Sequence, residues 1–242
     1  MENIFERLEL AVGKENMDKL KNTKVLIFGV GGVGGYVCEA LARSGIGRID
    51  LVDSDVVDPS NINRQIIALE STIGMDKCEV MKKRILDINK ECDVNTRNCF
   101  FLPENSNSFD FKQYDYVIDC VDTVSAKVEI IVKANKEKVK CISAMGAGNK
   151  INPTMLYVSD IYKTKVCPLA KVMRGALKKR GIKKLKVVYS IEKPLPIKQM
   201  FNEESKKPIP SSSIFVPATM GLIIASEVIK DITSIKNENK GA

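Results

Sequence analysis

This sequence predicts an α/β fold of the Rossmann-like type, with a mainly parallel sheet and helices on both faces. Short apolar runs alternate along the chain with longer stretches of helical periodicity, which is the pattern of strand–helix–strand units. A glycine-rich segment joins the first apolar run to the helical stretch after it, as in nucleotide-binding folds of this class. The 242 residues, 44% hydrophobic and 28% charged, suffice for one large domain with its own core.

The first half of the chain carries the regular alternation. A leading amphipathic helix falls within residues 1–21, and its polar end serves as a linker. Apolar runs rich in β-branched residues are typical of buried parallel strands, and stretches with i, i+3, i+4 spacing are typical of the helices that cover them. We therefore expect strands at 24–29, 48–53, 93–101, 114–122 and 140–145, and helices at 36–47, 74–89 and 125–138.

The character of the sequence changes after Gly148. We expect an extended strand at 153–162, a basic helix at 168–181, a strand at 185–190, an irregular loop at 202–213 and a final helix at 216–232. Neither an internal repeat nor a convincing linker divides the chain. The prediction is one domain over 1–232, with a nucleotide-binding half at about 22–148, a basic substrate-side half at about 149–232, and a flexible tail at 233–242.

Composition excludes several kinds of chemistry. The chain has no histidine, which rules out Ser-His-Asp and Cys-His catalysis and every His-ligated metal site. Its seven cysteines are scattered and never spaced as Cys-x-x-Cys, so neither a disulfide framework nor a four-cysteine zinc site is indicated. The longest uncharged stretch, 208–226, contains three prolines and four serines, which disfavours membrane insertion. We expect a cytoplasmic protein.

The glycine-rich segment fits the dinucleotide-binding pattern G-x-G-x-x-G in its required place between a strand and a helix. Its glycines are Gly29, Gly31, Gly32 and Gly34, and Asp53 ends the next strand, where it can bind a ribose hydroxyl. Glycine lets the backbone approach a phosphate, and the helix N-terminus offers N–H groups. By itself this pattern does not distinguish NAD, FAD, SAM and ATP.

The stretch "DSDVVDPSNINRQ" (53–65) favours ATP. A hydride-transfer enzyme needs no arginine beside the adenine half of its cofactor, whereas cleavage between the α and β phosphates builds charge that cations and amides must stabilise. Asn61, Arg64 and Lys77 supply such groups, with Asp53 and Asp55 at the nucleotide. Asp122, just beyond a predicted strand, is the favoured carboxylate for Mg²⁺; Asp119 is the weaker choice because it should lie within that strand.

These motifs together resemble the ThiF/MoeB/HesA superfamily, the bacterial relatives of ubiquitin-activating enzymes. The matching pieces are "GVGGVGG", "LVDSDVVDPSNINRQ", the Lys77 of "GMDKCEV", and "DCVD". Longer segments, among them "EALARSGIGRIDLVDSDVVDPSNINRQIIAL" and "GAGNKINPTMLYVSDIYKTKVCPLAKVMR", are similar to the tRNA threonylcarbamoyladenosine dehydratases of the TcdA or CsdL type. This resemblance covers about residues 5–230.

The resemblance implies a ThiF-type adenylation fold and an ATP-dependent enzyme. Such enzymes adenylate the carboxylate of threonylcarbamoyl on an adenosine beside the tRNA anticodon. The side chain then closes on itself, giving cyclic threonylcarbamoyladenosine, AMP and pyrophosphate. An internal nucleophile at high effective concentration removes the need for one from the enzyme, which agrees with a chain that lacks histidine.

The family likeness also assigns partners. It matches Arg7, in "FERLELAVG", with an N-terminal arginine that reaches the ATP site of the partner subunit, which implies a homodimer; the alternative is an exposed arginine on an amphipathic helix. A cysteine desulfurase or sulfur-acceptor protein is a further expected partner. Two rival functions remain: activation of a ubiquitin-like sulfur carrier's C-terminus, as in MoeB or ThiF, and a non-catalytic nucleotide-binding scaffold.

A basic segment, 163–186, holds ten lysines and arginines and no acid, although the whole chain has a net charge of only +8. Within its helix we predict an apolar face of Leu169, Val172, Met173, Ala176 and Leu177. A tRNA phosphate-contact surface is expected at Lys171, Arg174, Lys178, Lys179, Arg180, Lys183 and Lys184. A solvated helix face and a membrane-surface helix are the alternatives. Cys167, beside this helix, is expected to be structural.

Overall fold

A single seven-stranded sheet runs through the protein in a computed structural model, which describes residues 3–196 and 210–235. The strand order is β3-β2-β1-β4-β5-β7-β6, and all neighbours are parallel except the antiparallel pair β6 and β7. From β1 the chain winds outward on one side to β3 and then returns to β4 on the other. This reversal between β1 and β4 is the place where open α/β sheets bind ligands, at the carboxyl ends of the strands.

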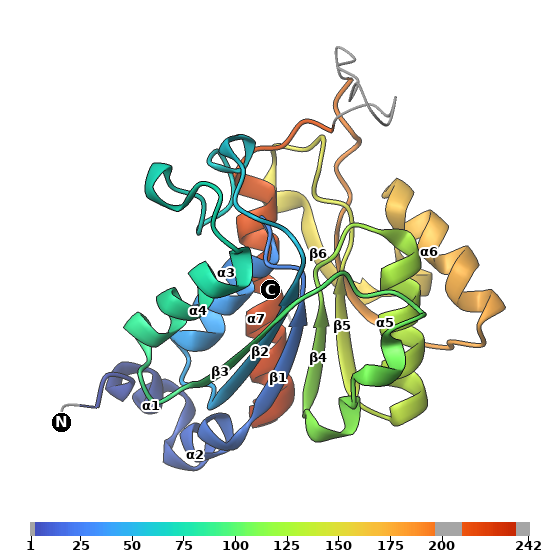
Figure 1. The fold of residues 1–242 in the computed structure, drawn as a ribbon. Helices are drawn as coiled ribbons and strands as arrows, with labels where there is room; N and C mark the ends of the chain where they lie inside the picture. Colours follow the sequence, from blue (N-terminus) through green and yellow to red (C-terminus); the bar gives the residue numbers. More distant parts are fainter. Residues whose placement is uncertain (1–2, 197–209, 236–242) are drawn as a thin grey trace.

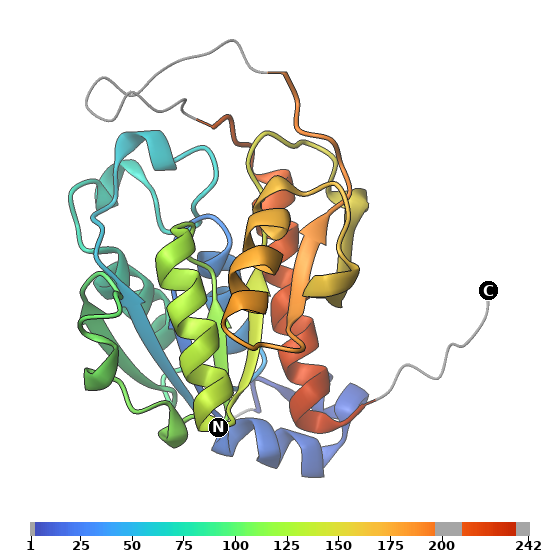
Figure 2. The same cartoon turned by 90° about the vertical axis from the view of Figure 1, so that its right-hand side faces the viewer.

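Helices cover both faces of the sheet, as the alternation predicts. Helices α3, α4 and α7 lie on one face, and α5 and α6 lie side by side on the other (Figures 1 and 2). The strands are β1 (Lys24–Phe28), β2 (Arg48–Asp53), β3 (Asp93–Asn98), β4 (Tyr116–Asp119), β5 (Lys140–Ala144), β6 (Leu156–Asp160) and β7 (Lys186–Ser190). The helices are α1 (Glu6–Val12), α2 (Lys14–Asn22), α3 (Gly34–Ala42), α4 (Lys77–Ile88), α5 (Val124–Glu137), α6 (Pro168–Lys179) and α7 (Phe215–Thr233).

The expected leading helix is two helices. Gly13 separates α1 from α2 with φ +84°, a left-handed backbone conformation that favours glycine, so the chain turns there. Helix α2 buries Met17 and Leu20 in the core, whereas α1 buries none of its residues fully. The amphipathic pattern continues across Gly13 and therefore conceals the break.

The expected helices and strands elsewhere are present, with small shifts at their ends. In α4 the predicted inward residues Met81 and Ile85 are fully buried and Val80 and Ile88 are half-buried against the core. The strand expected at 153–162 is shorter, because a turn of 3₁₀ helix bounds it on each side, at Pro153–Met155 and Ile161–Lys163. The loop expected at 202–213 and the tail at 233–242 lie largely outside the described residues.

The face predicted for α6 needs one correction. Met173 and Leu177 are fully buried, but the side of the helix at Val172 faces solvent, with 53% of that residue exposed. Val172 therefore belongs to the exposed surface, because the side of α6 that packs in the core is narrower than the apolar stripe in the sequence. Within the described residues, no helix is both long and apolar enough to cross a membrane.

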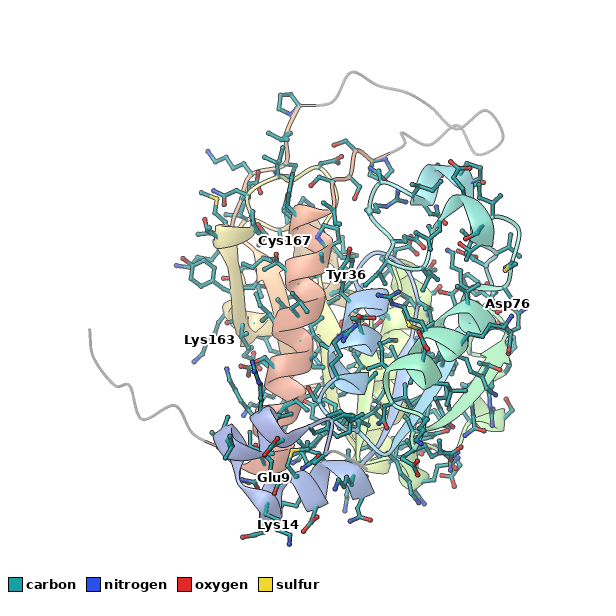
Figure 3. All side chains as sticks on the ribbon, turned by 90° about the vertical axis from the view of Figure 1, so that its left-hand side faces the viewer. Glu9, Lys14, Tyr36, Asp76, Lys163 and Cys167 are labelled. Carbon is teal, nitrogen blue, oxygen red and sulfur yellow. The ribbon has the colours of Figure 1, made fainter. Side chains whose placement is uncertain are left out.

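Helix α7 packs directly on the start of α3. A Cβ atom on Gly221 would lie 2.4 Å from the carbonyl oxygen of Val33 and 2.9 Å from Cβ of Tyr36, so only glycine permits this approach. Figure 3 shows α7 alongside the segment labelled at Tyr36. The final helix thereby supports the loop between β1 and α3 from behind.

Candidate nucleotide site

A cavity of about 570 Å³ opens at the carboxyl ends of β1, β4 and β5. Its walls come from both halves of the chain, since the loops after these strands meet the start of α6 and the segment at 210–212. All the nucleotide-binding residues predicted from the sequence line it, with the exception of Gly34: Gly29, Gly31, Gly32, Asp53, Asp55, Asn61, Arg64, Lys77 and Asp122.

The glycine-rich loop has the form that a phosphate cradle requires. Gly29 has φ +86°, and a Cβ on Gly34 would lie 1.8 Å from the carbonyl oxygen of Gly29, so these two glycines make the turn itself. Gly31 and Gly32 differ, because the nearest atoms to a Cβ there are 3.8 and 3.5 Å away. Their role is to leave room in the cavity rather than to fold the loop.

The Asp53 carboxylate accepts two backbone hydrogen bonds, one of them from the glycine-rich loop. Its Oδ2 accepts a hydrogen bond from the backbone N–H of Val30 at 2.6 Å, and its Oδ1 accepts one from the N–H of Asp55 at 2.9 Å. Burial raises the pKa of the Asp53 carboxyl, although these N–H donors and the nearby Lys77 act in the opposite direction. Besides the predicted ribose contact, Asp53 therefore holds the glycine-rich loop against β2, a role the sequence did not reveal.

The segment after β2 is ordered by its own side chains. Asp58 caps a 3₁₀ turn, Pro59–Asn61, and Oδ1 of the buried Asn61 accepts from the N–H of Asp58 at 3.2 Å. Arg64 donates through one guanidinium nitrogen, Nη1, to the Ser60 carbonyl at 2.7 Å and to Oδ1 of Asn63 at 2.9 Å. These two bonds fix the guanidinium of Arg64, a residue of the cavity wall whose Cγ packs beside Gly32.

Gln65 is a cavity residue without a predicted role. It is 7% exposed, and its Oε1 is a buried atom with no hydrogen-bond partner among the described residues. Its amide Nε2 lies 3.8 Å from the position of a Cβ on Gly31. A buried amide oxygen without a partner is uncommon and is expected where a ligand completes the site. The only sequence signal was its place directly after Arg64.

The cationic side chain of Lys77 is buried where α4 begins. Its Nζ lies 2.8 Å from Oδ2 of Asp55. The N-cap Asp76 accepts from the N–H of Glu79 at 3.2 Å, which fixes the first turn of α4 and the lysine with it. Lys77 and Arg64 therefore bring two positive charges to one cavity.

The two aspartates after Ile118 have different environments, as predicted. Asp119 ends β4, is fully buried, and pairs with Nζ of Lys127 at 2.8 Å. The same Nζ donates to the carbonyls of Val121 at 3.0 Å and Ala144 at 2.7 Å. Lys127 thereby ties together the ends of β4 and β5. Asp122 stands beyond this network as an exposed carboxylate on the cavity wall.

The described residues hold no cluster of three or more acidic, cysteine or histidine side chains suited to a metal ion. A magnesium ion here would have Asp122 as its protein ligand and would take most other ligands from phosphate and water. That division is usual for Mg²⁺. The donor set therefore fits a nucleotide-bound magnesium ion rather than a metal held by protein alone.

Two further cavity residues come from the substrate-side half. Lys150 was not predicted; it is 4% exposed, and its Nζ donates to the carbonyl of Gly146 at 2.9 Å. Cys167 is 1% exposed, as expected of a structural cysteine.

Arg7 does not line the cavity of its own chain. It is exposed on α1, and the labelled residues Glu9 and Lys14 of the first two helices lie at the opposite end of the molecule from Cys167 (Figure 3). Among the predicted tRNA-contact residues, Arg174 is half-buried and donates to the carbonyl of Thr164 at 3.1 Å. The others are exposed: Lys171, Lys178, Lys179, Arg180, Lys183 and Lys184.

Comparison with known proteins agrees with this geometry. The model of the ThiF family matches residues 5–242. A tRNA threonylcarbamoyladenosine dehydratase of Bacillus subtilis is 47% identical over 238 residues, which are 94% of each chain. The crystal structure of the Escherichia coli tRNA N6-threonylcarbamoyladenosine dehydratase with AMP superposes with a TM-score of 0.86 at 33% identity, covering 95% of this chain and 94% of that one. The same enzyme with ATP gives 0.84, covering 98% and 96%.

Proposed function

Because this chain belongs to the ThiF family, we propose that it is an ATP-dependent tRNA threonylcarbamoyladenosine dehydratase. It adenylates the carboxylate of threonylcarbamoyladenosine next to the anticodon and cyclises it, releasing AMP and pyrophosphate. The observation that carries this proposal is the 47% identity, over 94% of both chains, to an enzyme of that name. The ATP and AMP complexes of the E. coli relative support the nucleotide.

ATP occupies the cavity with its phosphates over the glycine-rich loop and its ribose at Asp53. A carboxylate oxygen of the substrate attacks the α-phosphorus, and the bond from that phosphorus to the bridging oxygen of pyrophosphate breaks. Charge builds on the α-phosphoryl oxygens and on pyrophosphate, where Asn61, Arg64 and Lys77 stabilise it. Asp122 would hold Mg²⁺, which supplies further neutralisation of the phosphate charge.

The acyl adenylate then reacts with a nucleophile from the same side chain, and AMP leaves. Closing a ring within one bound molecule gives a high effective concentration, so no enzyme nucleophile takes part. The burial of Cys167 supports this assignment, because a thiol 1% exposed is poorly placed to attack or to receive sulfur. A cysteine desulfurase or sulfur-acceptor protein stays a proposed partner, and it would bind without a sulfur transfer to Cys167.

The working unit is a homodimer in which Arg7 reaches the partner's ATP site. Arg7 lies outside the cavity of its own chain and is exposed, which supports a role in another subunit. The chain between β2 and α4 also carries exposed apolar side chains suited to a subunit interface: Val56, Ile62, Leu69, Ile73 and Met75.

The tRNA lies along the basic segment 163–186, in the cytoplasm, and one domain over 1–232 performs both half-reactions. Exposed cations on and after α6 support the tRNA path, since they contact phosphates without reading sequence. The continuous sheet shared by both halves supports the single domain.

The deciding experiment is mass analysis of tRNA nucleosides from cells with and without the gene. Loss of the cyclised adenosine, restored by the unchanged gene but not by Arg64→Ala, is the expected result. Arg43→Ala, which removes a surface arginine paired with Glu39, is the matched control and should restore it. Unchanged nucleosides, together with ATP-dependent adenylation of a ubiquitin-like protein's C-terminal glycine, would instead establish the sulfur-carrier alternative.

A further inference from the structure

Lys150 is a buried cation on the substrate side of the cavity. It belongs to the loop that follows β5, is 4% exposed, and is part of the cavity lining. Its Nζ donates to the carbonyl oxygens of Gly146 at 2.9 Å and Gly148 at 3.5 Å, both in its own loop.

The charge of this ammonium group has no carboxylate partner in residues 3–196 and 210–235. The other two buried lysines of that part of the chain differ, since Nζ of Lys77 pairs with Asp55 and Nζ of Lys127 with Asp119, both at 2.8 Å. A buried charge that meets only carbonyl dipoles is costly unless an anion joins it. Lys150 is therefore poised to receive an anion from the cavity.

The first turn of α6 converges on the same place. Around the position of a Cβ on Gly146 lie Sγ of Cys167 and Cβ of Leu169, both at 3.6 Å, and Nζ of Lys150 at 3.9 Å. Cys167 is the N-cap of this helix and makes no side-chain cap bond to its N–H groups. A helix N-terminus attracts anions through those groups and its dipole.

The region around Nζ of Lys150 lies to one side of the glycine-rich loop. Two strand spacings separate β5 from β1, roughly 10 Å across the sheet. Only one spacing separates β5 from β4, which precedes Asp122. An anion at Lys150 would thus lie beside the triphosphate rather than within it, as a second reactant must.

We propose that Lys150 and the first turn of α6 form an anion subsite that binds the substrate's carboxylate before it attacks the α-phosphorus. This inference rests on the proposed function and deepens it, because it names the protein groups that hold the second reactant. The ammonium and helix N–H groups neutralise the carboxylate while it is positioned, and they let it go when its oxygen bonds to phosphorus.

The test uses the full-length protein and an anticodon stem–loop RNA that carries threonylcarbamoyladenosine. Lys150→Gln keeps a donor for the Gly146 carbonyl but loses the charge, so it should raise the KM for this RNA roughly tenfold or more while the ATP Kd stays within about twofold. Lys150→Arg restores the charge and should recover most of the affinity. Lys112→Gln, at an exposed lysine outside the cavity lining, is the matched control.

A second measurement separates charge recognition from loop support. RNA whose carboxylate is converted to a primary amide should bind the unchanged protein more weakly, and Lys150→Gln should weaken that binding no further. Three results would overturn the inference: a rise in the ATP Kd in place of the RNA KM, a fall in melting temperature with unchanged RNA KM, or equal loss of binding for both RNAs. If the unchanged protein does not cyclise the RNA at all, the proposed function itself fails, and this inference with it.

Discussion

Nζ of Lys77 lies 2.8 Å from Oδ2 of Asp55, a pair that joins a side chain 6% exposed to one 61% exposed. The first turn of α4 holds the Lys77 side chain in the interior of the protein, whereas Asp55 lines the cavity with most of its side chain exposed. The carboxylate of Asp55 therefore orients the Lys77 side chain while it stays largely exposed itself. A phosphate that enters the cavity meets a cation whose position is already fixed.

Lys77→Met should lower kcat/KM for ATP by roughly 10²–10³-fold, because a stabilising charge at the reacting phosphates is lost. Asp55→Asn should cost less than about tenfold, since the helix still places the lysine. Steady-state kinetics with varied ATP would measure both. Equal losses for the two variants would mean that the pair, not the lysine alone, binds the nucleotide.

Alanine in the glycine-rich loop should act differently at two positions. Gly34→Ala sets a Cβ 1.8 Å from a backbone oxygen and should cost about 2 kcal/mol of unfolding free energy or more. Gly31→Ala has no atom nearer than 3.8 Å and should leave the melting temperature nearly unchanged while weakening ATP binding. Thermal unfolding and ATP titration on both proteins give the comparison. A destabilised Gly31→Ala protein would show that the loop has no room for a methyl group at this position.

Lys127→Met should destabilise the protein by about 3–5 kcal/mol, because it leaves the carboxylate of Asp119 buried without its charged partner, with only the Ser143 hydroxyl and the N–H of Val121 still donating to it. The double variant Lys127→Met/Asp119→Asn removes that charge and should recover part of the loss. Urea unfolding of the three proteins measures this. If the double variant is as unstable as the single one, the lysine's bonds to Val121 and Ala144 matter more than the ion pair.

Replacing the five cations Lys178, Lys179, Arg180, Lys183 and Lys184 with glutamine should raise the KM for tRNA while ATP binding stays near normal. Each lost phosphate contact should reduce the log–log salt slope of tRNA binding by roughly 0.7–0.9. A matched control removes five cations elsewhere: Lys14, Lys19, Lys21, Lys82 and Lys83. Similar tRNA affinity in the two variants would leave the basic segment as a solvated surface only.

Acid should weaken the fold through Asp50. Burial raises the pKa of its carboxyl, but hydrogen bonds from Arg48, Tyr114 and Asn95 outweigh this effect, and the pKa lies below its ordinary value of 3.8. The folded state thus binds a proton less readily than the unfolded one, so this stabilisation is present above about pH 4 and is lost as pH falls lower. Asp50→Asn should flatten the decline in urea-unfolding free energy below pH 4; an unchanged decline would assign it to other carboxylates.

The strands and most helices could be predicted because their signals are local. The run 25–28 is apolar and contains two β-branched residues, and the turn at Gly29 and Gly34 needs glycine by backbone geometry alone. The break at Gly13 was hidden because the amphipathic pattern runs through it, and the exposure of Val172 depends on how much of α6 the sheet covers.

The candidate site divides in the same way. Arg64 and Lys77 are charged residues in motifs that follow one another in a characteristic order, so both could be predicted as site residues from the sequence. Lys150 could not be predicted as a site residue, because a lysine in a loop is usually solvated and its burial beside the start of α6 depends on tertiary packing. The second role of Asp53 likewise depends on the N–H of Val30, 23 residues away in the chain.

The support that α7 gives to α3 has a consequence for synthesis on the ribosome. The glycine-rich loop is made early, yet Gly221, on which its packing depends, belongs to the last helix of the described chain. A nascent chain can pair β1 through β5 as they emerge, but the back of the phosphate loop stays uncovered until α7 has left the exit tunnel. Nucleotide binding should therefore begin only after α7 has emerged, so that a chain interrupted before Gly221 holds no ATP and offers exposed apolar surface to chaperones or proteases instead.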